Sequence, residues 1–70
     1  MNEIIFLVNE NENGEYSASA MGRAISITAS SWDELKFLAQ REILRFFENG
    51  KHPQSIRLHL IKEEVLTLES

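Results

Sequence analysis

The stretch Ile4-Ile5-Phe6-Leu7-Val8 decides the fold, because it is a strand with apolar residues on both sides. Side chains of a strand alternate between its two faces, so Ile4, Phe6 and Val8 point one way. Ile5 and Leu7 point the other way. Such double-sided hydrophobicity is typical of a central strand. One clear helix follows in the sequence, and it can cover one face of a small sheet. We therefore expect the second apolar face to be covered by a partner, by a second copy of the chain, or by the chain's own tail.

Short segments after this stretch predict an antiparallel meander. Residues 3–9 form the first strand, and residues 16–20 and 24–28 alternate with period two, as half-buried strands do. Asn13-Gly14 marks the first turn, because this dipeptide readily adopts positive φ. Met21-Gly22-Arg23 marks the second turn.

The helix has explicit start and stop signals. Ser31 and Glu34 fit a capping box, in which the Ser31 hydroxyl accepts the Glu34 amide and the Glu34 side chain returns to the cap. The helix is predicted over about residues 32–48. Asn49-Gly50 provides a left-handed stop, and Pro53 forbids continuation.

An apolar stripe on this helix should lie on the sheet. Its members are Trp32, Leu35, Ala39, Ile43, Phe46 and Phe47. Phe37 and Leu44 lie almost opposite the stripe, on the solvated face, and form a weaker candidate contact patch.

A fourth strand is predicted over residues 55–61, with Arg57 and His59 on the face opposite its apolar side chains. The third strand runs parallel to the first, and a right-handed helical crossover should return the fourth parallel to it as well. The expected fold is therefore α+β, β-β-β-α-β, with sheet order 3-2-1-4 and one helix packed on one face. After Lys62-Glu63-Glu64, the apolar tail over residues 65–68 has three possible fates: a short fifth strand, a turn of helix, or pairing with another molecule.

Composition indicates one globular domain over residues 1–70. The chain has 43% hydrophobic and 26% charged residues and contains no cysteine. A core of this size contributes only a few kcal/mol of net stability, and dimerisation is a standard remedy. The lack of cysteine excludes disulfides and thiolate metal sites, and it suits a reducing cytoplasm.

Charge bounds the class of partner. The net charge is −4 and the isoelectric point is about 5.0. Nucleic acids are bound mainly through Lys and Arg, so direct binding to nucleic acid is not expected. An acidic protein attracts a basic protein partner. No apolar run approaches the ~20 residues that span a bilayer, so no membrane association is expected either.

No constellation of catalytic residues is visible, and no catalytic, cofactor or metal site is predicted. The carboxylates lie mostly in the turn, the helix cap and the tail, where water reaches them. His59, beside Arg57, is the best single candidate for chemistry, but no nucleophile or orienting group accompanies it in sequence. An enzyme or small-ligand binder using the face around His59 and Arg57 is the alternative, and an orphan structural domain is another.

Several motifs occur in a specific order: an acidic turn closing in Gly14-Glu15-Tyr16, then Ala18 and Ala20, then Ser31-Trp32-Asp33-Glu34-Leu35 with Glu42 on the helix. In order and spacing they resemble the HicB-like antitoxin domain over about residues 6–50. The resemblance implies a partial RNase H-like fold without RNase activity. It also implies oligomerisation and binding to a small basic HicA-type toxin that cleaves mRNA.

Two departures from that family matter. Met21-Gly22-Arg23-Ala24 replaces the Pro-rich segment before the third strand. The C-terminal DNA-binding extension of full antitoxins is missing, so operator binding is not expected.

The expected function is a cytoplasmic, non-catalytic interaction module, a homodimer or higher homo-oligomer. Its contacts should come from the open sheet face and the tail, with a second patch on the helix. The candidate residues are Ile5, Leu7, Arg57, His59, Val65, Leu66, Leu68, Phe37 and Leu44.

Overall fold

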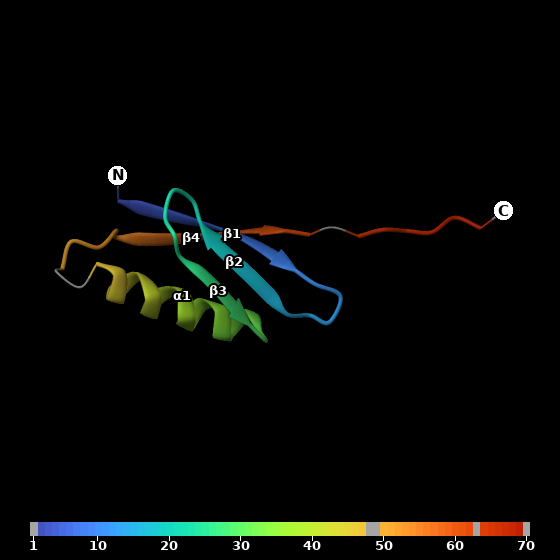
Figure 1. Ribbon diagram of the computed structural model, residues 1–70, viewed down its shortest axis with the longest axis horizontal. Helices are drawn as coiled ribbons and strands as arrows, with labels where there is room; N and C mark the ends of the chain where they lie inside the picture. The colour runs from blue at the N-terminus through green and yellow to red at the C-terminus, as the bar shows by residue number, and fades with distance from the viewer. Residues whose placement is uncertain (1, 48–49, 63, 70) are drawn as a thin grey trace.

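A four-stranded sheet with one helix on one face forms the body of the computed structural model (Figure 1), which describes residues 2–47, 50–62 and 64–69. The elements are β1 (Glu3–Glu10), β2 (Tyr16–Ala20), β3 (Ser26–Ala29), α1 (Trp32–Phe46) and β4 (Ser55–Ile61). The strand order is β3-β2-β1-β4, with β4 parallel to β1 and the other neighbours antiparallel. The predicted α+β class, element order and sheet order are confirmed.

The core lies between the sheet and α1. On β1, the side chains of Ile4, Phe6 and Val8 are buried, as the alternation predicts. Ala20 stands opposite Phe6 and Ala18 opposite Val8 on β2, so small side chains flank large ones beneath the helix. The remaining buried hydrophobic residues are Ile25, Ile27, Ala29, Leu35, Ala39 and Ile43.

The loop between β1 and β2 is organised by Asn11. The Asn11 Oδ1 accepts the backbone N–H groups of Asn13 and Glu15, each at 2.9 Å. Gly14 has φ of +80°, a region that L-residues rarely adopt. Asn13 does not share this positive φ, so the predicted two-residue turn with positive φ at both positions is not formed. The loop spans residues 11–15, between β1 and β2, and is therefore longer than a two-residue hairpin.

The helix begins as predicted but its cap is built differently. The Glu34 N–H donates to the Ser31 Oγ at 3.1 Å, which confirms Ser31 as the N-cap. The Glu34 carboxylate accepts the Ser30 N–H at 2.6 Å and the Ser30 hydroxyl at 3.0 Å. The returning side chain therefore stabilises the residue before the cap, because Ser30 offers two donors.

Two details of the helix differ from the sequence prediction. The helix ends at Phe46, where the Phe47 N–H donates to the Ile43 carbonyl at 3.1 Å. The predicted end near Glu48 and stop at Asn49 lie outside the described residues. Phe46 is exposed, which contradicts its place in the buried stripe. It lies beside the segment preceding β3, and β3 is the sheet's edge, so no further strand covers this ring.

The tail leaves the body of the protein. Residues 64–69 form neither strand nor helix, and they continue away from the sheet beyond the end of β4 (Figure 1). Val65, Leu66 and Leu68 are strongly exposed. The tail does not turn back toward the sheet. The described tail residues therefore form neither the predicted fifth strand nor a cover for the sheet face opposite α1.

Candidate interaction surface

The sheet face opposite α1 brings four of the predicted residues together. Ile5 and Leu7 on β1 stand opposite Arg57 and His59 on β4, respectively. Leu7 is 36% exposed and Ile5 is half-buried, since neighbouring strand side chains cover them in part. We call these four residues the open face. Its apolar centre is accessible, flanked by a cation and an imidazole.

Arg57 is held in place by an ion pair. Its guanidinium lies 3.1 Å from a Glu3 carboxylate oxygen, and its Nε–H donates to the other oxygen at 3.2 Å. The hydrogen bond and then the charge of Glu3 raise the pKa of Arg57 above its ordinary value. The side chain therefore stays charged on the open face at any physiological pH.

The surroundings of His59 and Arg57 suit surface contact. Within residues 2–47, 50–62 and 64–69, no polar or charged residue is buried. In the same part of the chain, no three His, Cys, Asp or Glu side chains converge on a possible metal site.

Acidic side chains gather at one end of the molecule, next to the open face. Glu10, Glu15 and Glu34 line one shallow hollow. Glu10, Glu12 and Glu64 line a neighbouring one. We call these five residues the acidic end. Hydrogen bonds from Ser30, first backbone and then hydroxyl, lower the pKa of Glu34, which keeps this carboxyl charged.

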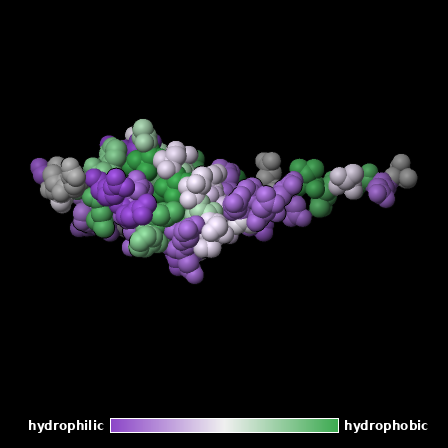
Figure 2. Space-filling view, turned by 60° about the horizontal axis from the view of Figure 1, so that its bottom comes forward, coloured by the Kyte–Doolittle hydropathy of each residue, from purple (hydrophilic) through white to green (hydrophobic). Residues whose placement is uncertain are grey.

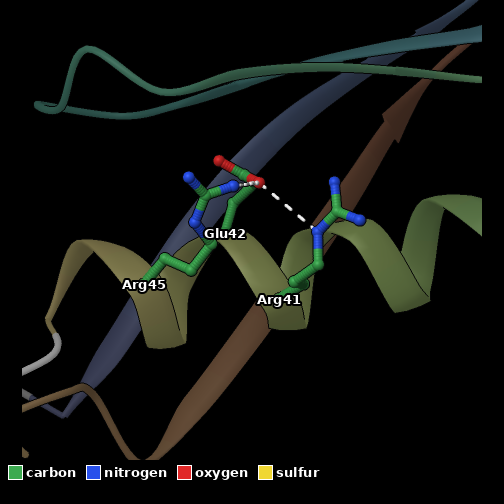
Figure 3. Close-up of polar contacts among 3 residues, drawn as sticks. All are labelled: Arg41, Glu42 and Arg45. Carbon is green, nitrogen blue, oxygen red and sulfur yellow. Dashed lines mark hydrogen bonds and ion pairs between the residues drawn. The ribbon is translucent and has the colours of Figure 1, made fainter.

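Several basic side chains form ion pairs within the described residues, away from the acidic end. Arg41 and Arg45 both reach the Glu42 carboxylate, at 3.6 and 3.4 Å (Figure 3). Lys36 pairs with Asp33 at 3.2 Å. Within the described part of the chain, no comparable ion pair involves the acidic end. The acidic end therefore brings five carboxylates together, with Lys62 lining the same hollow as Glu10, Glu12 and Glu64.

The outer face of α1 carries the second predicted patch. Phe37 and Leu44 are both more than half exposed. The Arg41 guanidinium lies 6.0 Å from the centre of the Phe37 ring, so a cation already covers part of it. This patch faces away from the sheet, and the structure does not join it to the open face.

The tail and the edge of the sheet form a third apolar region. Val65, Leu66 and Leu68 protrude with the tail, and Figure 2 shows hydrophobic side chains along it beyond the folded body. Leu60 and Ile61, at the end of β4, are also exposed. The sequence prediction missed these two residues and the acidic end. The alternation over residues 55–61 could have indicated the exposure of Leu60 and Ile61. The acidic end could not be found this way, because its residues come together only when distant segments of the chain meet.

No helical segment in the described residues is long and apolar enough to cross a bilayer.

The fold and its surface define a class: a small α+β protein with a mixed sheet, one face of which is left accessible beside an acidic end. The chain belongs to the UPF0150 family. It is 39% identical over 51 residues to a UPF0150 protein of Archaeoglobus fulgidus, a match that covers 73% of this chain and 76% of the relative. No family model matches the chain. No solved structure matches it either.

Proposed function

We propose that this protein is a HicB-like antitoxin domain, or a derived relative, that acts without catalysis. Its partner would be a small basic HicA-type toxin that cleaves mRNA, bound in the cytoplasm. The β-β-β-α-β order and the sheet order agree with the fold that the resemblance to HicB-like domains implies. Membership of the UPF0150 family is consistent with a small protein of this kind.

The observation that carries the proposal is the junction of the open face with the acidic end. β1 carries Ile5 and Leu7 on the open face and ends at Glu10, whose side chain alternation places on the helix side, so the acidic end borders the open face at the end of this strand. A basic protein would be attracted by the acidic end over long range. Close contact would then remove Ile5 and Leu7 from water. The mechanism is steric, since a bound acidic domain covers the surface with which the toxin holds RNA.

The test uses a small basic HicA-type toxin, sought first in the gene beside this one. Wild-type protein should bind it and relieve the growth arrest that it causes. Glu10→Gln/Glu12→Gln should weaken binding about tenfold at low salt and less at high salt, because exposed charges are screened. Ala24→Lys/Gln40→Lys makes the same change of +2 in net charge away from the acidic end, and it should bind almost as tightly as wild type.

A second pair of variants tests the open face. Leu7→Glu places a charge at its centre and should abolish rescue, whereas Phe37→Glu, on the outer face of α1, should retain it. Circular dichroism checks that both variants remain folded. The proposal fails if wild-type protein neither binds such a toxin nor relieves its growth arrest. It also fails if Phe37→Glu loses rescue and Leu7→Glu keeps it.

A further inference from the structure

One of the two edges of the sheet is formed by β4, and the other by β3. β4 pairs with β1 over residues 55–61 and is last in the sheet order, so its other side presents backbone donors and acceptors without a strand partner in the described chain. Such an edge is a template for another extended segment. Added strands gain affinity from main-chain bonds and specificity from alternating side chains.

The tail supplies an extended apolar segment of the right kind. Leu60 and Ile61 at the end of β4 are each 41% exposed, and Leu66 and Leu68 in the tail are 76% and 93% exposed. The tail extends away from the sheet beyond β4, so it cannot cover the edge of its own sheet without turning back (Figure 1). The edge of a second copy is accessible to it.

We propose that two copies of this chain associate through antiparallel pairing of each tail with β4 of the other copy. In this register Leu66 stands opposite Leu60 of the second copy, and Leu68 stands opposite Leu58. Val65 stands opposite Ile61. Residues 57–62 of each copy lie opposite residues 64–69 of the other, and the two sheets join into one. The contact is self-complementary, as a twofold dimer requires.

Several pairing registers, which differ by steps of two residues, keep each side chain on the same face of the sheet. The charged residues favour the proposed register over the others. It places Lys62 opposite Glu64 of the second copy and Arg57 opposite Glu69, so opposite charges meet twice on each side. Shifting one tail by two residues in one direction, the smallest shift that keeps each side chain on its own face, puts Glu64 opposite Leu60 and Lys62 opposite Lys62. Like charges directly opposite each other destabilise a sheet, and a charge facing Leu60 would leave that side chain uncovered.

The absence of cysteine from the sequence allows a direct test of the register. Ile61→Cys/Val65→Cys should form a disulfide-linked dimer under mild oxidation, because directly opposite Cα atoms lie about 4.5–5.5 Å apart. Within one chain these positions are about 13 Å apart along a strand, so they cannot close on each other. His59→Cys/Val65→Cys is the matched control. In the proposed register its cysteines are displaced by two residues, and it should cross-link at least tenfold more slowly.

Oligomeric state and charge exchange complete the test. Light scattering should give a dimer for the full chain and a monomer for the chain ending at Lys62. Lys62→Glu should raise the dimer dissociation constant about fivefold, and Lys62→Glu/Glu64→Lys should restore it. A full chain that is monomeric at all concentrations overturns the proposal, as does a truncated chain that still dimerises. Faster cross-linking of the His59→Cys control overturns the register. None of these outcomes depends on the toxin partner proposed above.

Discussion

Two leucines on the same helix offer a matched test of which face of α1 is buried. Leu35 is 0% exposed and Leu44 is 54% exposed. Truncation of a buried leucine to alanine costs about 2–5 kcal/mol, from lost transfer energy and the cavity left behind. Full burial of a leucine is worth about 1.5–3 kcal/mol, so Leu44→Ala, at a half-buried site, should cost about 1 kcal/mol. Both changes are Leu→Ala within one helix, so intrinsic helix propensity affects them similarly.

The comparison is measured by urea unfolding, followed by circular dichroism, at two protein concentrations. A domain of this size has a total stability of about 4–10 kcal/mol, so Leu35→Ala should leave a marginally folded protein. Its melting temperature should fall by at least about 8 °C, against about 4–8 °C for Leu44→Ala. Equal losses for the two variants would refute the reasoning, because they would place Leu44 in a covered interface. A loss at Leu44 that grows with protein concentration would assign that cover to a second copy.

Three further predictions concern the loops and the helix cap. Ser31→Ala should cost about 1 kcal/mol in urea unfolding, because the Glu34 N–H loses its acceptor; an unchanged midpoint would remove Ser31 as the cap. Ser30 lowers the pKa of Glu34 from the ordinary value of 4.5, so this carboxylate stabilises the fold above that pH and the stability is lost as pH falls through the lowered value. Glu34→Gln should therefore flatten the fall in the urea midpoint between pH 6 and 3, and a parallel fall in both proteins would contradict this. Gly14→Ala should cost about 1 kcal/mol from its φ of +80° alone, since no atom lies within 4 Å of the added carbon; Gly14→Asn should cost less, because Asn tolerates this conformation.

The sequence was sufficient for features that depend on neighbours along the chain. Alternation in the first strand predicts the burial of Phe6 and the exposure of Leu7, because strand geometry has a period of two. The helix start at Ser31 follows from local hydrogen bonding that any helix requires. The parallel direction of β4 follows from the helical crossover that joins it to β3, and its place beside β1 follows from the apolar residues on both sides of β1.

Features that depend on where elements end relative to one another were not predictable in this way. Helical periodicity places Phe46 on the buried stripe, but the sheet ends at β3 and leaves the ring exposed. Glu34 bonds to Ser30 because of how the chain enters the helix, which a capping motif alone does not specify. The acidic end combines Glu12, Glu34 and Glu64 from the first loop, the helix start and the tail, and only the folded chain brings them together.

The two proposed contacts use different surfaces, so they can operate together. Pairing of the tails occupies the outer side of β4 and the end of the strand, whereas the toxin would bind across Ile5 and Leu7 on the sheet face. In the dimer the sheets join through β4, so both open faces remain available, and each acidic end keeps Glu10, Glu12, Glu15 and Glu34 while Glu64 pairs with Lys62 of the second copy. Each dimer would then offer two equivalent sites. Linked sites bind more tightly to a partner that can engage both at once, by virtue of effective concentration. Loss of the tail should therefore weaken capture of a dimeric basic partner while leaving the affinity of each single site unchanged. This separates the contribution of self-association from that of the open face.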